Sequence, residues 1–439
     1  MEAIKVGLIG FGTVGSGMAQ VLHEQAGRLQ KKVGTEIVLK RVADIRIEAL
    51  PPHLAGIELT RDVQQVLADP GIDIVVELIG GIEPAKSFIL AAIANGKHVV
   101  TANKALISQH GSEIFAAAHA RGVEVGFEAS VGGGIPVIKA LKEGLVANRI
   151  LSVMGILNGT ANFILSTMTD QGLPFATVLR QAQEKGYAEA DPTYDVEGID
   201  TAHKLAILMN LAYGMSIRLD EISIEGISCI EPIDIAFGRD LGYRIKLLAI
   251  TRNHGDHVEA RVHPTLVPED HMLASINGAY NGINFRGDMV GDVLLYGYGA
   301  GKMPTGSAVA ADIVDIARNI LNGSINRVPA LSYRHEHLRP RRITPLEELQ
   351  GPYYIRISAV DHPGVLSTIS GILGKHGISI ESVIQKGRNA QGSVPVVMVT
   401  HDAREAAVRQ ALAQIDALDI CTARSVKIRI LVNDGEEEH

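Results

Sequence analysis

A glycine-rich turn near the start of the chain constrains the fold more than any other feature. Residues 4–9 predict a buried strand, and residues 16–30 predict a helix with apolar side chains on one side. Between them stands Gly10-Phe11-Gly12-Thr13-Val14-Gly15. In this setting Gly10 permits a tight turn, Gly12 lets the backbone approach a pyrophosphate, and Gly15 lets the helix pack closely. The turn therefore predicts a dinucleotide site at the N-terminus of the helix.

Strands and helices continue to alternate after this turn. We expect strands at 37–44, 72–79, 97–101 and 123–127, with helices at 84–95 and 111–120. This order predicts a doubly wound parallel sheet, a Rossmann domain, over residues 1–130. The second strand ends in Arg41-Val42-Ala43-Asp44-Ile45-Arg46, which offers an acid for a ribose hydroxyl and arginines for a 2′-phosphate. NAD and NADP both remain open.

A second segment at the same sheet edge is Thr101-Ala102-Asn103-Lys104, which follows a predicted strand. Ligands of doubly wound sheets bind at the carboxyl ends of the strands. We therefore expect Lys104 near the nicotinamide or the substrate, the alternative being an ordinary surface lysine.

The strand and helix rhythm changes in the rest of the chain. Residues 131–302 mix helices with strands such as 150–157 and 257–267, which predicts an α+β substrate domain. A helix at about 303–322 is expected to return to the first domain. Residues 323–350 are rich in Arg, His and Pro, as in a linker. Residues 351–432 follow the order βαββαβ of a ferredoxin-like domain, and 433–439 form an acidic tail.

The densest group of ionisable residues is the segment 186–195, GYAEADPTYD, followed by Asp200 and Lys204. Asp200 and Lys204 are four residues apart on a predicted helix, so they share a face, and the next turn of that face carries Ile207 and Leu208. A solvated ion pair would not border an apolar turn. We expect Lys204 to be partly buried, where desolvation lowers its pKa and Asp200 raises it, as suits a general acid or base. A structural ion pair would explain the spacing equally well.

Composition narrows the class of protein. The two cysteines, Cys229 and Cys421, lie far apart and predict no disulfide framework, which fits a reducing compartment. The net charge is −8 with scattered cations, so neither nucleic acid nor a membrane is an expected partner. No apolar run approaches the ~20 residues of a membrane span. We expect a soluble, cytoplasmic protein that binds small molecules and itself.

Several motifs together closely resemble the homoserine dehydrogenases. They are GFGTVG at 10–15, TANK at 101–104, FEASVGGGIP at 127–136, GILNGTANFIL at 155–165 and GYAEADPTYDVEGIDTAHKLAIL at 186–208. The resemblance covers nearly the whole chain. From Tyr353 onward, with DHPGVL at 361–366 and HGISI at 376–380, the chain resembles an ACT domain.

The resemblance implies NAD(P)-dependent, reversible reduction of L-aspartate 4-semialdehyde to L-homoserine, in threonine, methionine and isoleucine biosynthesis. It implies that Lys204 donates a proton to the substrate carbonyl oxygen, with Asp200 and Lys104 completing the catalytic set. It also implies substrate contacts at Thr160, Tyr187, Glu189, Asp195 and Asp200. The implied cofactor contacts are Gly10, Gly12, Thr13, Val14, Gly15, Arg41, Thr101, Lys104, Gly186, Glu189 and Gly301. The implied ligands of a monovalent cation, Na⁺, are Glu128, Val131, Gly133 and Ile135.

The ACT resemblance implies regulation and self-association. Threonine is the expected feedback inhibitor, with Gln385 as a contact, although Ser379 stands where many ACT domains carry asparagine and so leaves the ligand open. The central domain is expected to dimerise, giving a homodimer or homotetramer. The alternative function is a noncatalytic amino-acid sensor that keeps the Rossmann and ACT folds, and the intact Lys104, Asp200 and Lys204 argue against it.

Overall fold

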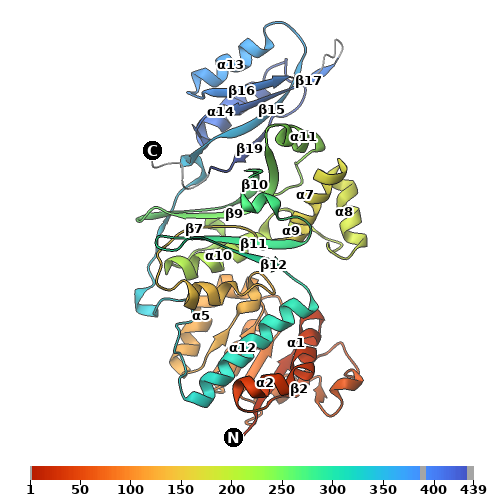
Figure 1. Cartoon of the computed structure of the whole chain (residues 1–439), viewed down its shortest axis with the longest axis vertical. Coiled ribbons are helices and arrows are strands. Elements are labelled where there is room, and N and C mark those ends of the chain that lie inside the picture. The colour runs from red at the N-terminus through yellow and green to blue at the C-terminus, as the bar shows by residue number, and fades with distance from the viewer. Residues whose placement is uncertain (1, 386–391, 433–439) are drawn as a thin grey trace.

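The molecule is elongated, with three regions stacked along its long axis (Figure 1). The computed structural model describes residues 2–385 and 392–432, so the acidic segment 433–439 lies outside the described residues. The N-terminal region lies at one end, the ACT region at the other, and the central region between them. Within the described residues, no helix has the length and apolar character needed to cross a membrane.

The N-terminal region is built on a six-stranded parallel sheet. Its strand order is β3-β2-β1-β4-β5-β6, the order of a Rossmann fold. The strands are β1 (Ile4–Ile9), β2 (Ile37–Ala43), β3 (Glu58–Thr60), β4 (Ile74–Glu77), β5 (His98–Thr101) and β6 (Val125–Gly126). The predicted fold class is confirmed. Strand β3 was not expected, because its three residues are all at least partly exposed and give no apolar signal.

Two helix predictions in this region were wrong in their bounds. The single helix expected over 16–30 is two helices, α1 (Thr13–Glu24) and α2 (Ala26–Val33), because the chain turns at Gln25 and α2 then lies against α12 (Lys302–Asn322). Helix α5 (Lys104–Arg121) begins well before residue 111. The Asn103 side chain caps it by accepting a hydrogen bond from the Leu106 N–H at 3.1 Å.

Helix α12 packs closely against α1, as Figure 1 shows. Glycines allow the contact. A Cβ on Gly17 would lie 2.2 Å from the Lys302 carbonyl oxygen, and a Cβ on Gly306 would lie 2.6 Å from the Gly17 carbonyl carbon. The chain thus leaves the N-terminal region, builds the central region and returns through α12.

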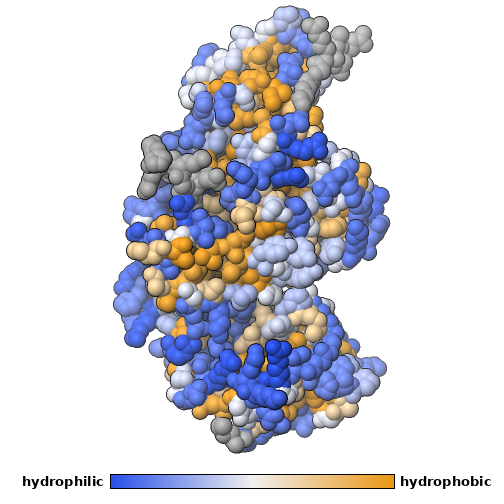
Figure 2. All heavy atoms as spheres, viewed as in Figure 1, coloured by the Kyte–Doolittle hydropathy of each residue, from blue (hydrophilic) through white to orange (hydrophobic). Residues whose placement is uncertain are grey.

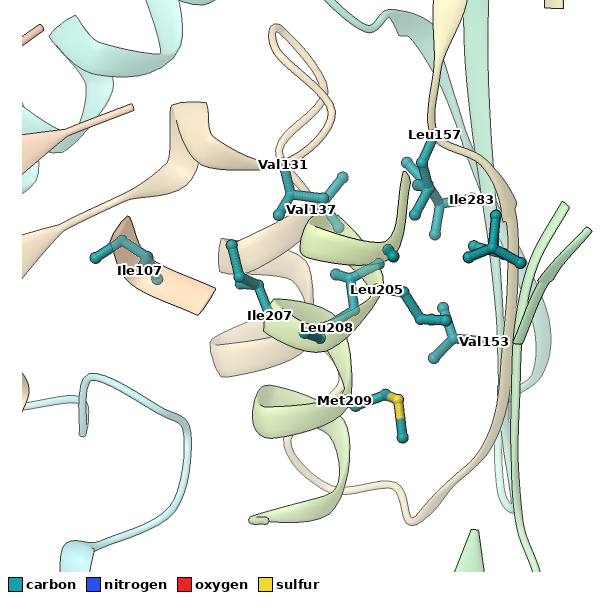
Figure 3. Close-up of a cluster of buried hydrophobic side chains, with 14 of the residues drawn as sticks. Ile107, Val131, Val137, Val153, Leu157, Leu205, Ile207, Leu208, Met209 and Ile283 are labelled. Atoms are coloured by element: carbon teal, nitrogen blue, oxygen red, sulfur yellow. The ribbon is translucent and has the colours of Figure 1, made fainter. Parts of the chain in front are cut away.

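The central region places its helices against a sheet. Its long strands are β7 (Ile150–Ile156), β9 (Tyr243–Asn253), β10 (His257–Pro268), β11 (Tyr280–Gly287) and β12 (Gly291–Tyr298). Helix α10 (Ile199–Tyr213) lies between this sheet and the N-terminal region. Figure 3 shows Leu205 of α10 near Val153 and Ile283 of the sheet, while Ile207 lies near Val137 on the other side. Helix α10 contacts both strand β9 of this sheet and helix α5 of the N-terminal region, which fixes its position between the two regions.

The C-terminal region has the ferredoxin-like order that the sequence predicts. It comprises β15 (Tyr353–Val360), α13 (Val365–Lys375), β16 (Ile380–Gln385), β17 (Ser393–Thr400), α14 (Glu405–Asp416) and β19 (Val426–Ile430). Its strands lie in the order β19-β15-β17-β16. Strand β19 also pairs in parallel with β10, Thr265 opposite Arg429, so the ACT sheet continues the central sheet.

The connector over 323–350 lies against the central region for part of its length. Its strand β13 (Arg342–Ile343) pairs with β10 at His257 and Val258. Leu331 is buried, and the Tyr333 hydroxyl donates a hydrogen bond to the Ala212 carbonyl at the end of α10.

Candidate active site

The glycine-rich turn after β1 has the geometry of an anion cradle. Gly10 has a φ of +96°, and a Cβ on Gly15 would lie 2.1 Å from the Gly10 carbonyl oxygen. Gly12 caps α1, and a Cβ there would meet no atom within 4 Å. In the described residues no side chain caps this helix, so the backbone N–H groups around Thr13 and Val14 are open to a ligand. The turn therefore fits the phosphates of a dinucleotide.

The end of β2 carries the residues that bear on NAD or NADP. The Asp44 carboxylate accepts hydrogen bonds from the N–H of Phe11 at 2.6 Å and of Arg46 at 2.7 Å. The Arg41 guanidinium is paired with Glu58 and Asp69. Arg41 would have to leave these acids to reach a cofactor, whereas the side chain of Arg46 is exposed beside the turn.

The carboxyl ends of β4 and β5 carry a buried pair that the sequence did not suggest. The Thr101 hydroxyl donates to a Glu77 oxygen at 2.7 Å, and both residues are fully buried. The other Glu77 oxygen accepts from the N–H of Ile79 at 2.8 Å and of Gly80 at 3.2 Å. Glu77 thus shapes the loop beside the glycine-rich turn. Within a run of apolar strand residues, only its position at the strand end could have signalled this role.

Asp200 joins two lysines at the point where α5 and α10 meet. The Lys204 Nζ lies 2.7 Å from Asp200 Oδ2, and the Lys104 Nζ forms an ion pair with Asp200 Oδ1. Lys204 also donates to the Leu157 carbonyl oxygen at 2.7 Å. The side chains of Asp200 and Lys204 are 2% and 9% exposed, whereas that of Lys104 is 36% exposed. An ammonium has three N–H donors, so Lys204 keeps one for a further acceptor.

Burial and charge set the protonation of this cluster. Burial lowers the pKa of Lys204 from its ordinary 10.5, and the Asp200 carboxylate opposes that shift. For Asp200, burial would raise the pKa, but the ammonium groups of Lys204 and Lys104 outweigh it and hold the pKa below its ordinary value. Asp200 is therefore a carboxylate at neutral pH. Lys204 has the environment of a group that can give up and regain a proton.

Asn158 connects this cluster to Asp195. Its side-chain amide donates to Asp195 Oδ1 at 2.7 Å and to Asp200 Oδ2 at 2.8 Å, while its oxygen caps α7 (Gly159–Gln171). Burial raises the pKa of Asp195. The sequence did not predict this role of the Asn158 side chain, because a contact with residues 37 and 42 positions away leaves no local pattern.

Tyr194 and His203 border the two lysines. The Lys104 ammonium lies 5.8 Å from the centre of the Tyr194 ring, which stacks on His203 at 5.6 Å. Burial raises the pKa of Tyr194 to about 12 and lowers that of His203. The His203 Nδ1 lies 2.6 Å from the Ser108 hydroxyl of α5. These neutral groups border the cation side of the cluster.

The loop at 186–191 lies farther out. The Thr160 hydroxyl donates to the Tyr187 carbonyl oxygen at 2.6 Å, and the Tyr187 ring packs on Phe163. Gly186 and Glu189 are exposed. Among the contacts of the described residues, none joins the Glu189 carboxylate to Lys104, Asp200 or Lys204.

Two glycine loops meet beside the cluster. A Cβ on Gly133 would lie 2.4 Å from the Gly299 carbonyl oxygen, and Gly301, with a φ of +127°, begins α12. The Glu128 carboxylate accepts from the N–H of Ile138 at 2.8 Å and of Lys139 at 2.9 Å, so it caps α6 (Val137–Lys139). A cation at Glu128, Val131, Gly133 and Ile135 would therefore rest mainly on backbone oxygens. Within residues 2–385 and 392–432, no group of three His, Cys, Asp or Glu side chains could hold a metal ion.

Three family models match the chain. Residues 10–128 match the NAD-binding domain of homoserine dehydrogenase, residues 136–314 match homoserine dehydrogenase, and residues 353–419 match the ACT domain. Homoserine dehydrogenase of Pseudomonas aeruginosa is 48% identical over 431 residues, which cover 98% of this chain and 99% of that protein. That of Neisseria gonorrhoeae is 45% identical over 430 residues, with the same coverage.

A solved structure agrees with these matches. The crystal structure of a homoserine dehydrogenase from Thiobacillus denitrificans has a TM-score of 0.93 and 48% identity, covering 98% of this chain and 99% of that chain. The predicted resemblance is confirmed. The chain belongs to the homoserine dehydrogenase family and carries a C-terminal ACT domain.

Proposed function

We propose that the chain reduces L-aspartate 4-semialdehyde reversibly to L-homoserine, with Lys204 as the proton donor to the substrate carbonyl oxygen. The observation that carries this proposal is the Lys204 ammonium, which is buried, paired with Asp200 and left with one N–H donor. When bound, the nicotinamide cofactor supplies or accepts the hydride at the carbonyl carbon. The residues of the chain bind and orient the substrate and the cofactor, and they move the proton.

The acidic side of the site suits a substrate that carries an ammonium group. Asp195 and Asp200 lie within reach of one amide, that of Asn158, and Glu189 stands on the exposed loop. We assign these three carboxylates to the substrate ammonium, with Thr160 and Tyr187 beside it. Lys104, the more exposed lysine, assists Lys204 and contacts the cofactor.

The cofactor position follows from the sheet edge. We assign the phosphates to Gly10, Gly12, Thr13, Val14 and Gly15, and the nicotinamide end to Thr101, Lys104, Gly186, Glu189 and Gly301. Asp44 favours a free ribose hydroxyl, whereas Arg46, or Arg41 after leaving its acids, favours a 2′-phosphate.

A monovalent cation, Na⁺, is proposed at the turn formed by Glu128, Val131, Gly133 and Ile135. This turn touches the loop that begins α12, since Gly133 and Gly299 are in contact. A cation there would hold the two loops together and stabilise the entrance to the site.

We propose that the ACT domain binds threonine as a feedback inhibitor and that Gln385 contributes to the site. Gln385 is exposed at the end of β16, which forms the edge of the ACT sheet. An exposed edge strand of this kind can pair with a second ACT domain.

A homodimer or homotetramer is supported by the surface of the central region. Figure 2 shows hydrophobic side chains gathered over the central strands. Strand β12 forms the edge of the sheet opposite β16. On it, the side chains of Tyr296 and Tyr298 are 55% and 54% exposed. A cytoplasmic location is proposed because Cys229 and Cys421 are both free thiols.

The test is the oxidation of NADPH and of NADH with L-aspartate 4-semialdehyde, with and without L-threonine. We expect turnover with at least one cofactor and inhibition by threonine.

The Lys204→Ala variant should bind cofactor normally and lose about 10²–10⁴-fold in kcat, the usual contribution of a general acid. The control is Lys86→Ala, whose lysine is partly buried and pairs with Glu113 instead of Asp200. Cofactor binding without turnover by the unaltered chain would favour the noncatalytic sensor.

A further inference from the structure

The Leu157 carbonyl oxygen helps to set the direction of the Lys204 ammonium. Lys204 donates one N–H to Asp200 and a second to this carbonyl, both at 2.7 Å. The three N–H groups of an ammonium have fixed directions relative to one another. The positions of the first two acceptors therefore determine where the third N–H points. A shift of the Leu157 carbonyl would turn the N–H that we assign to the substrate.

A second side chain, that of Asn281 on β11, binds the same carbonyl. The Asn281 Nδ2 donates to the Leu157 oxygen at 3.0 Å. Leu157 follows the last residue of β7, and the pairing of β7 with β11 ends at Ile156 opposite Gly282. The carbonyl thus lies just beyond the regular pairing of the two strands, where a side chain can hold it.

The Asn281 amide is closely confined. The residue is fully buried, and it stands opposite Gly297 in the pairing of β11 with β12. A Cβ on Gly299 would lie 2.1 Å from the Asn281 Nδ2 and 2.4 Å from its Oδ1. The amide therefore lies directly against Gly299, where a residue with a side chain would displace it. This contact keeps the amide in one position beside Leu157.

The amide oxygen indicates which part of Asn281 the site uses. Its Oδ1 is buried and has no hydrogen-bond partner within residues 2–385 and 392–432. Burying a polar atom without a partner costs free energy, and such atoms are rare in folded proteins. A leucine side chain has about the same shape and would avoid this cost. The feature that only the amide supplies is its N–H donor, which binds Leu157.

Asn281 also connects the proton donor with the loop on the cofactor side. Gly299 belongs to the segment that leads through Gly301 into α12. We assign Gly301 to the nicotinamide end of the cofactor. The amide thus joins this segment to the carbonyl that orients Lys204, so one side chain relates the source of the proton to the source of the hydride.

We propose that Asn281 is a positioning residue of the reduction, which holds the Leu157 carbonyl so that the third N–H of Lys204 points to the substrate carbonyl oxygen. The inference rests on the proposed function. Because Asn281 acts through Leu157, its loss should lower kcat and leave the KM for the substrate and the Kd for the cofactor nearly unchanged.

The test compares the full chain with Asn281→Leu, which keeps the shape of the side chain and removes its donor. We expect kcat with L-aspartate 4-semialdehyde to fall about 10-fold to 10²-fold, since a misplacement of about 1 Å in an active site can cost 10²-fold. The thermal unfolding midpoint should not fall. The matched control is Asn284→Leu on the same strand, whose amide donates to Asp292 at 2.9 Å and whose loss should leave kcat unchanged.

Asn281→Asp supplies a rescue that depends on pH. A protonated carboxyl group can donate to the Leu157 oxygen as the amide does, whereas a carboxylate cannot donate and would draw the Lys204 ammonium away from Asp200. The kcat of Asn281→Asp, divided by that of the unaltered chain, should therefore rise as the pH falls from 8 to 6. The same ratio for Asn281→Leu should stay constant.

The outcomes separate this inference from the proposed function. If the unaltered chain turns over and Asn281→Leu keeps its kcat, the inference is wrong and the proposed function stands. If Asn281→Leu does not fold, a relative kcat of Asn281→Asp that is independent of pH overturns the inference, and so does the failure of both variants to fold. Absence of turnover by the unaltered chain would overturn the proposed function and this inference with it.

Discussion

The Asp200 carboxylate favours the charged form of the buried Lys204. Burial and the Lys104 charge lower the pKa of Lys204, whereas the Asp200 carboxylate, and more weakly that of Asp195, raises it. Lys104 contacts one oxygen of the Asp200 carboxylate and Lys204 contacts the other, so Asp200 also fixes the distance between the two lysines. One residue thus influences both the charge and the position of Lys204, the proton donor that we propose.

Asp200→Asn should therefore shift the pH dependence of reduction as well as slow it. Without the Asp200 carboxylate, burial and Lys104 are opposed only by the weak influence of Asp195, so the pKa of Lys204 falls. Because the proposed reduction requires protonated Lys204, the alkaline limb of the kcat profile should move to lower pH by about one unit or more, each unit corresponding to about 1.4 kcal/mol. Steady-state rates from pH 6 to 10 measure this.

Asp195→Asn is the matched control for that shift. Asp195 contacts Asn158 and is the weakest of the influences on Lys204, so its loss should move the alkaline limb much less. An unchanged limb in Asp200→Asn, with kcat lowered equally at every pH, would show that Asp200 only positions the lysines.

At the scale of elements, the α1–α12 contact joins the nucleotide turn to the end of the central region. Gly17 and Gly306 allow the two backbones to touch, and α1 begins at the cradle formed by Gly12. Any side chain at Gly17 must push the helices apart at the base of the cofactor site.

Gly17→Ala should destabilise the chain by about 1–3 kcal/mol, the usual cost of overpacking a close contact. Gly27→Ala is the control, because Gly27 is an exposed helical residue of α2 with no atom within 4 Å of an added Cβ. It should stabilise by about 0.4–1 kcal/mol. Urea unfolding of both variants measures the difference; equal effects would mean that the helices separate at no cost.

The sequence predicted elements wherever apolar periodicity was strong. The expected ranges agree with those of strands β1, β2 and β10. The expected βαββαβ order agrees with that of the ACT region. Weakly apolar elements such as β3 were missed, and the turn at Gln25 left no signal.

The residues of the candidate site also divide into those that a local sequence pattern predicted and those that it did not. Asp200 and Lys204 share a helix face, so their pairing was visible from spacing alone. Asn158, Glu77 and the ion pair of Lys104 depend on contacts between distant segments, which no local pattern encodes.

At the scale of the whole molecule, the ACT sheet is continuous with the central sheet, and a chain of contacts leads from it to Asp195. Arg429 of β19 pairs with Glu225 at 2.8 Å. Two residues later, the Ile227 N–H donates to the Val196 carbonyl oxygen at 2.8 Å, directly after Asp195. A displacement of β19 can therefore be transmitted to Asp195 through the Arg429–Glu225 ion pair, the segment 225–227 and the hydrogen bond between Ile227 and Val196.

Arg356 makes a second tie between the same regions, and its loss should separate them. Its guanidinium, 8% exposed, lies 2.6 Å from the fully buried Asp234 of α11 (Pro232–Asp240). Arg356→Met leaves that carboxylate buried without its cation, which typically costs about 3–5 kcal/mol. Since the cost falls on the junction, calorimetry should show the ACT region unfolding in a separate, earlier transition.

Arg409→Met, which removes an exposed pair with Glu347, should cost no more than about 1 kcal/mol and keep the original profile. A single, unshifted transition in Arg356→Met would mean that strand pairing between β10 and β19 alone holds the regions together.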